Sequence, residues 1–149
     1  MAYEVELSAI PLFSGLKKAD LTRLGRSITQ REYKKGRAIV KQGDAATAFF
    51  IIMHGRVEVI VASGKTSKKV KELGREGFFG EMALIDGAKR GATVRALTDT
   101  DCLVLPRRAF LAEIKANPRV AVAMLPALAA QARQDARDTR PVAALMRYL

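Results

Sequence analysis

The chain has 149 residues and carries 26 Lys and Arg against 15 acidic residues, which gives a formal net charge of +11. This length predicts a single domain covering residues 1–149, large enough to bury a core of its own. The longest uninterrupted apolar run, residues 48–53, is too short to cross a bilayer, and no apolar signal-peptide core follows Met1, so we expect a cytoplasmic location without a membrane span. The single cysteine, Cys102, excludes an internal disulfide, and its apolar neighbours favour a buried thiol.

The net charge is unevenly distributed along the chain. Residues 15–41 carry +7 and residues 107–149 carry +5, whereas residues 78–106 carry −1. A basic body around a near-neutral segment could steer an anionic ligand inward or dock onto an acidic partner. It could equally serve only to keep a small domain soluble, and the sequence leaves these alternatives open.

The first part of the chain, residues 1–30, has a helical pattern. Its apolar residues recur at spacings that suit short helices, and they are Ile10, Leu12, Phe13, Leu16, Leu21, Leu24 and Ile28. Asp20 is of a residue type that caps helix starts, so we expect it to cap one of these helices. The sequence therefore predicts a helical lead-in.

Residues 31–105 change to the pattern of β-strands. Six short segments are rich in β-branched or alternating apolar residues, and they are 37–43, 48–53, 56–61, 68–73, 91–97 and 102–105. Turn dipeptides separate them at Lys35-Gly36, Gly43-Asp44, His54-Gly55, Ser63-Gly64 and Asp86-Gly87. Many short strands at this spacing favour an antiparallel β-roll or jelly-roll barrel over a parallel sheet, so the predicted class is α+β, mainly β.

Residues 106–149 return to a helical period. We expect one helix at 107–116, ended by Asn117-Pro118, and a longer one at 119–138. Pro126 lies inside the longer pattern and predicts either a kink or a boundary there.

Residues 78–95, FFGEMALIDGAKRGATVR, carry the most informative pattern in the chain. Glu81 offers a carboxylate that can accept a hydrogen bond from a sugar hydroxyl, and Arg90 offers a planar cation suited to two phosphate oxygens. Backbone N–H groups at a helix start after Gly80 would attract the same phosphate. Further ligand contacts are expected from Met82, Ala83, Gly91 and Ala92. These are the parts needed to hold a ribose with a cyclised phosphate.

This segment resembles the phosphate-binding cassette of cyclic-nucleotide-binding domains, as found in protein kinase A regulatory subunits, nucleotide-gated channels and the catabolite activator protein. In that family a glutamate holds the ribose 2′-hydroxyl and an arginine nine residues later holds the cyclic phosphate. Glu81 and Arg90 stand at those positions with that interval. Residues 34–61 resemble the family's early β-roll, and residues 11–24 resemble its helical lead-in. The resemblance implies a cyclic-nucleotide ligand and no other cofactor.

Two positions depart from the family pattern. Lys89 stands where proline is frequent, and its ammonium group could touch the phosphate or point to water. Gly91 stands where members selective for cyclic GMP often have a threonine that contacts guanine. The resemblance therefore favours cAMP as the ligand and leaves cGMP open.

The family encloses the base between strand residues before the cassette and a C-terminal helix that acts as a lid. The resemblance implies Val70 and Leu73 as the strand contributors, and Leu128, Gln131 and Arg133 as lid candidates. An ordinary helix with one buried and one solvated face would show the same lid residues, so both interpretations stay open. The implied mechanism is a population shift, in which bound phosphate draws the cassette inward and the C-terminal helices close over the base.

The sequence carries no catalytic signature. His54 is the single histidine, which argues against a metal site, and no nucleophile elbow, Cys–His pair or Walker loop occurs. We therefore expect a non-catalytic sensor that signals to an unknown protein effector. One alternative is a regulatory module excised from a larger channel, kinase or enzyme. Another is a DNA-binding transcription regulator, but the chain ends too soon after residues 119–138 for a helix-turn-helix, so specific DNA binding is not expected.

Overall fold

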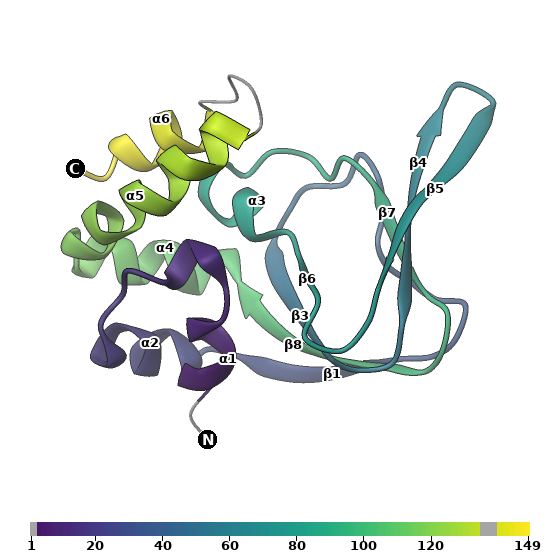
Figure 1. Cartoon of the computed structure of the whole chain (residues 1–149), viewed down its shortest axis with the longest axis horizontal. Coiled ribbons are helices and arrows are strands. Elements are labelled where there is room, and N and C mark those ends of the chain that lie inside the picture. The colour runs from purple at the N-terminus through teal and green to yellow at the C-terminus, as the bar shows by residue number, and fades with distance from the viewer. Residues whose placement is uncertain (1–2, 135–139) are drawn as a thin grey trace.

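A computed structural model describes residues 3–134 and 140–149 of the chain (Figure 1). The helices gather at one end of the molecule and two antiparallel β-sheets form the other end. Helices from the start and from the end of the chain therefore share one end of the molecule, although they are far apart in the sequence. This arrangement confirms the predicted α+β class with helices flanking a β-roll.

The N-terminal helices are short. They are α1 (Glu4–Ser8), a 3-10 turn (Pro11–Phe13) and α2 (Lys18–Gly25). The N-cap of α2 is Lys17, and Asp20 lies inside the first turn, where its Oδ2 accepts a hydrogen bond from the backbone N–H of Lys17 at 3.2 Å; Asp20 therefore helps to cap this helix, but not from the N-cap position. The helical lead-in ends slightly before residue 30, since the first strand already begins at Thr29.

In the described part of the chain, eight strands form two four-stranded sheets with the orders β1-β8-β3-β6 and β2-β7-β4-β5. The bounds are β1 (Thr29–Tyr33), β2 (Ala38–Val40), β3 (Ala48–His54), β4 (Val57–Ser63), β5 (Thr66–Leu73), β6 (Phe78–Phe79), β7 (Thr93–Ala96) and β8 (Thr100–Pro106). All pairings are antiparallel, and none that the structure describes joins the two sheets, so the fold is a roll rather than a closed barrel.

The predicted turns are all present, because the glycine of each turn dipeptide has a positive φ. Two strands lie outside the six predicted segments, namely the two-residue β6 and the longer β1. The residues of β1, TQREY, are mostly exposed on a sheet edge, and an edge strand without apolar alternation leaves no periodic signal.

Three helices follow the roll, namely α4 (Arg107–Ala116), α5 (Arg119–Gln134) and α6 (Arg140–Met146). Pro126 lies inside α5, which continues past it, so the proline does not mark a boundary. Pro126 has no N–H to offer the carbonyl of Val122 one turn earlier, and one helical hydrogen bond is therefore missing there. The predicted end of this helix, near residue 138, falls outside the described residues.

The described residues form two apolar clusters. The smaller lies between the sheets and contains Phe50, Ile52, Val57, Val59, Val94, Cys102 and Val104. Cys102 is fully buried as predicted, and burial raises the pKa of its thiol to about 12.

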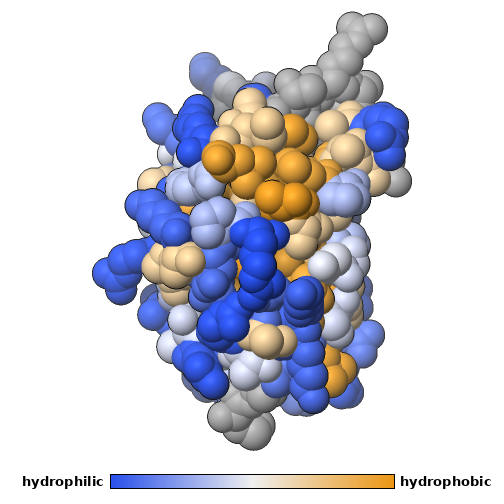
Figure 2. All heavy atoms as spheres, turned by 90° about the vertical axis from the view of Figure 1, so that its left-hand side faces the viewer, coloured by the Kyte–Doolittle hydropathy of each residue, from blue (hydrophilic) through white to orange (hydrophobic). Residues whose placement is uncertain are grey.

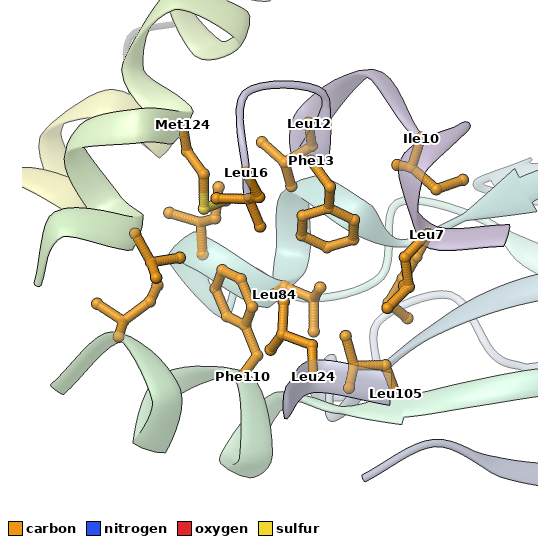
Figure 3. Close-up of a cluster of buried hydrophobic side chains, with 14 of the residues drawn as sticks. Leu7, Ile10, Leu12, Phe13, Leu16, Leu24, Leu84, Leu105, Phe110 and Met124 are labelled. Carbon is orange, nitrogen blue, oxygen red and sulfur yellow. The ribbon is translucent and has the colours of Figure 1, made fainter. Parts of the chain in front are cut away.

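The larger cluster fills the helical end and is shown in Figure 3. Side chains from the N-terminal helices, β8, α4 and α5 meet there, among them Phe13, Leu105, Phe110 and Met124. Leu84 of α3 (Glu81–Asp86), the short helix inside the predicted cassette, points into the same cluster. The cassette is therefore anchored in the core that joins the N-terminal and C-terminal helices.

The surface at the helical end is partly apolar. Figure 2 shows an apolar area in the upper half of this face, above a hydrophilic area. Large exposed apolar side chains include Val122 on α5, and Met146 and Leu149 at the end of the chain. Within residues 3–134 and 140–149, no helix has the length and apolarity needed to cross a bilayer.

Candidate functional site

The predicted cassette is a tight loop built around a glycine. Gly80 follows β6 and starts α3 with φ +88°, a conformation that residues with a Cβ avoid. A Cβ added there would lie 2.5 Å from Nη1 of Arg90 and 3.2 Å from the carbonyl oxygen of Ala48. Glycine is thus required at this position for two reasons, its backbone conformation and the closeness of the Arg90 guanidinium.

Arg90 is a buried cation. Its exposed fraction is 9%, its Nη2 donates a hydrogen bond to the Ala48 carbonyl at 2.6 Å, and its guanidinium carbon lies 5.7 Å from the ring centroid of Phe50. Burial lowers the pKa of Arg90. None of the ion pairs between described residues includes Arg90. An unpaired buried charge is costly, which marks this guanidinium as a candidate anion-binding group.

The backbone of Arg90 is held as firmly as its side chain. Its N–H donates to the carbonyl of Asp44 at 2.9 Å, and its carbonyl accepts from the N–H of Gly43 at 2.8 Å. Both partners belong to the turn between β2 and β3. The guanidinium is therefore positioned by a segment more than forty residues earlier in the chain.

A cavity of about 480 Å³ lies in front of Arg90 and is called the cassette cavity below. It brings together most of the predicted ligand contacts, which are Leu73, Gly80, Glu81, Ala83, Arg90, Gly91 and Ala92. Apolar residues of the roll, including Val40, Val59 and Val94, complete its wall. A carboxylate, a buried cation and an apolar surface thus face one space.

Several predicted contacts lie elsewhere. Met82, Leu128 and Gln131 line a separate hollow of about 50 Å³ together with Glu81 and Phe78. Leu128 is buried in the helical core, which agrees with the ordinary-helix alternative for that side chain. The structure describes no residue of α5 on the wall of the cassette cavity, and Arg133 is exposed.

Val70 is not part of the cassette cavity either, because its side chain is 55% exposed on β5. The physical reason is strand geometry. In the register with β4, Lys71 pairs with Val59 and Lys69 pairs with Ile60, so Val70 is the extra residue of a β-bulge, and its side chain is left on the exposed face. Lys71, which is two positions from Leu73, lines the cavity instead.

The sequence analysis missed two basic residues that bear on the site. Lys71 could have been found from the same alternation rule, because it lies on the Leu73 face of β5. Arg107 carried no signal. Its Nε donates to the Leu84 carbonyl at 3.0 Å and its Nη2 to the Ile85 carbonyl at 3.2 Å, which stabilises the C-terminal end of α3.

Lys89 is exposed and lies among the residues that line the cavity, so its ammonium group stands at the rim in contact with water. His54 is exposed as well. Within the residues that the structure describes, no group of three or more His, Cys, Asp or Glu side chains is arranged to hold a metal ion.

Comparison with protein families matches residues 30–117 to the cyclic nucleotide-binding domain. This chain belongs to that family. The family is a regulatory, ligand-binding one rather than a catalytic one. The matched residues include β2 to β8 and the whole cassette.

Individual relatives come from several kinds of protein. The chain is 39% identical over 99 residues to a cAMP-dependent protein kinase regulatory subunit of Mycosarcoma maydis, covering 66% of this chain and 19% of that protein. It is 36% identical over 115 residues to a cyclic nucleotide-gated potassium channel of Rhizobium etli, covering 77% of this chain and 31% of the channel. The chain thus spans less than a third of the length of these relatives.

Among solved structures, the Thermus thermophilus catabolite activator protein is 32% identical with a TM-score of 0.68. The alignment covers 85% of this chain and 60% of that one. These relatives establish the domain and its fold.

Proposed function

We propose that this chain is a non-catalytic cyclic-nucleotide receptor that prefers cAMP, with cGMP as the second candidate ligand. The observation that carries the proposal is Arg90, whose buried guanidinium has no ion-pair partner among the described residues and lines the same cavity as Glu81. A fixed guanidinium in a low-dielectric pocket binds phosphate oxygens strongly. The ligand would therefore supply the missing negative charge.

The cassette cavity has room for such a ligand. Its volume of about 480 Å³ lies in the range of small-molecule sites. We assign the cyclic phosphate to Arg90, the ribose 2′-hydroxyl to Glu81, and the base to the apolar wall that includes Leu73 and Val59. Gly91 and Ala92 add little bulk beside the phosphate, so the ligand can lie against the backbone there.

The preference for cAMP is supported by Gly91. Glycine has no hydroxyl, so it cannot make the contact to guanine that the family's threonine makes. The position itself is open, because nothing lies within 4 Å of a Cβ built at Gly91. A larger side chain, such as that of threonine, would therefore fit at this position without displacing a neighbour.

We propose that the signal passes from the cassette to the C-terminal helices. Leu84 and Ile85 of α3 pack in the same core as Met124 of α5, and α3 also contacts α6. A shift of α3 toward a bound phosphate would therefore change the packing of both C-terminal helices. The ligand can favour the shifted state only by binding it more tightly than the other state.

We propose that a protein partner in the cytoplasm recognises this movement. Exposed apolar side chains on α5 and at the chain end, Val122, Met146 and Leu149, lie on the elements that would move. The second candidate function is that the chain is a regulatory module of a larger channel or kinase. The small share of each relative that it spans, 19% and 31%, favours this candidate. The reading frame of the gene tests it.

Calorimetric titration of the chain with cAMP, cGMP and adenosine tests the receptor proposal. We expect saturable binding of cAMP, weaker binding of cGMP, and little binding of adenosine because it has no phosphate. The absence of saturable binding for both cyclic nucleotides would reject the proposal.

A double-substitution cycle tests the role of Glu81. The unmodified chain should bind 2′-deoxy-cAMP less tightly than cAMP by about 1.5–3 kcal/mol, the usual contribution of a hydrogen bond to a charged group. Glu81→Gln should bind both ligands with similar, reduced affinity. Glu58→Gln on β4 removes the same charge outside the cassette cavity and should keep the discrimination. Discrimination that persists in Glu81→Gln would assign the 2′-hydroxyl to another residue.

A further inference from the structure

A second cavity, of about 460 Å³, lies on the other open edge of the roll. It is lined by side chains from β1, β2, β8, the β2–β3 turn and the start of α4, and it shares Arg90 and Val40 with the cassette cavity. Alternate residues of β1, including Arg31 and Tyr33, face into it. It is called the cation cavity below.

The charges around the cation cavity are strongly unbalanced. Four cations line it, namely Arg31, Lys41, Arg90 and Arg108, against one carboxylate, Asp44. None of the four takes part in an ion pair with a described residue. Among the other basic side chains, Arg23, Lys34, Arg56, Lys69 and Arg119 form ion pairs with described carboxylates. Like charges that outnumber their counter-charges repel one another, and an anion between them would relieve this repulsion.

We propose that the cation cavity binds an oligophosphate, either free or as the phosphate chain of a nucleotide. Three or more negative charges in one small ligand match four cations better than a single carboxylate or monophosphate would. Guanidinium groups also suit phosphate, because their planar N–H groups bind two oxygens at once. The cavity volume lies within the range of small-molecule sites.

The shared guanidinium couples the two cavities. Arg90 lines both, so an anion in the cation cavity competes with a cyclic phosphate for the same cation and repels it. Oligophosphate therefore lowers the affinity for cyclic nucleotide, and cyclic nucleotide lowers the affinity for oligophosphate by the same factor. This coupling rests on the proposed function, whereas oligophosphate binding does not.

The test is calorimetric titration with inorganic triphosphate in the absence of cyclic nucleotide, with sulfate at equal ionic strength for comparison. We expect one saturable triphosphate site and no matching site for sulfate. Substituting both Arg31→Gln and Lys41→Gln should lower the affinity by at least about tenfold, as expected for lost hydrogen bonds to charged groups.

The matched control carries Lys65→Gln and Lys68→Gln, which remove the same charge from exposed residues of the β4–β5 hairpin outside the cation cavity. It should change the affinity by less than about twofold, because exposed distant charges are screened. Equal losses in the two double variants would show that bulk charge binds the anion and would overturn the proposal, as would the absence of saturable binding. A short single-stranded oligonucleotide that binds the same residues more tightly than triphosphate would overturn it in favour of nucleic acid.

Repeating the titration with ATP distinguishes the two sources of the phosphate chain. Equal affinity for triphosphate and ATP indicates that only phosphate is recognised, and a higher affinity for ATP indicates that the nucleoside is recognised too. If the chain binds cAMP, saturating triphosphate should lower the cAMP affinity by about fivefold or more. Triphosphate binding that leaves the cAMP affinity unchanged would reject the sharing of Arg90.

Discussion

Replacing Arg90 by methionine should weaken ligand binding strongly while changing the stability of the ligand-free fold very little. Arg90 is 9% exposed and forms no ion pair with a described carboxylate, and an unpaired buried ion costs several kcal/mol in effective desolvation. Its hydrogen bond to the Ala48 carbonyl stabilises the fold by about 1.5–3 kcal/mol, and its cation–π contact with Phe50 stabilises it by about 1–2 kcal/mol. Methionine keeps an apolar stem of similar length, and it removes both the desolvation cost and the two stabilising contacts.

We therefore expect the free energy of unfolding of Arg90→Met, without ligand, to lie within about 1.5 kcal/mol of the parent value. Binding should weaken by about 2–5 kcal/mol, as for removal of one partner from a buried charge pair. At a cAMP concentration one hundred times the dissociation constant of the parent, the parent should gain about 2.7 kcal/mol of stability, and the variant should gain less than about 1 kcal/mol.

Urea unfolding with and without cAMP measures both quantities. Far-ultraviolet circular dichroism is a suitable signal, because the chain contains no tryptophan. The matched control is Arg95→Met, an exposed residue of β7, which should retain both the stability and the gain from cAMP. A ligand-free loss above about 3 kcal/mol in Arg90→Met would show that the guanidinium is a structural group and refute this reasoning.

Three further predictions concern the loop and the helical end. Gly80→Ala should lower stability by about 1 kcal/mol or more and cAMP affinity by about tenfold, because φ is +88° and the added Cβ displaces Arg90. The control Gly91→Ala should leave the stability unchanged in a thermal melt, because nothing lies within 4 Å of its Cβ. Gly91→Thr should move the ratio of cGMP to cAMP affinity upward by about tenfold in competition titrations, the value of one hydrogen bond; an unchanged ratio would place base selection elsewhere. Asp20→Asn should cost about 2–4 kcal/mol of unfolding free energy at pH 7, because Asp20 is buried and hydrogen-bonded by Arg119 at 2.6 and 3.0 Å. Burial raises the pKa of Asp20, but hydrogen bonds and two guanidinium charges outweigh burial and hold this pKa below its ordinary value of 3.8. The stability that Asp20 contributes is therefore present above pH 3.8 and is lost as the pH falls through the folded-state pKa. Plots of unfolding free energy against pH for the parent and for Asp20→Asn should converge there, and parallel plots would contradict the assignment.

The turns and the two charged residues of the cassette could be predicted from the sequence, because they depend on residues that are neighbours in the chain. Glycines at turns signalled the strand ends, and Glu81 and Arg90 lie in one continuous loop, so their spacing alone indicated a shared site. Leu73, which the family resemblance implied, lines the same cavity. The prediction of Val70 as a contact was wrong, because Val70 does not line the cavity. The alternation of side chains along β5 could have predicted Lys71, which lies two positions from Leu73, in its place.

Long-range contacts had no such signal. The ion pair between Asp20 and Arg119 joins α2 to the first residue of α5 across most of the chain, and nothing in either local sequence indicates it. The same holds for Arg107, which stabilises the end of α3 from the start of α4. The lid residues are a similar case, because the position of α5 against the roll depends on packing in the helical core.

The amino-acid sequence was enough to identify the family, the β-roll and the two charged groups proposed to hold the ligand. These follow from contiguous motifs, in which residue type and spacing alone carry the information. The burial of Arg90 without a counter-charge emerged only from the folded chain, since Ala48, Phe50 and the Gly43 turn come from distant segments. Desolvation is a property of everything that surrounds a group, and for that reason the folding of the whole chain turns an ordinary arginine into a candidate phosphate-binding residue.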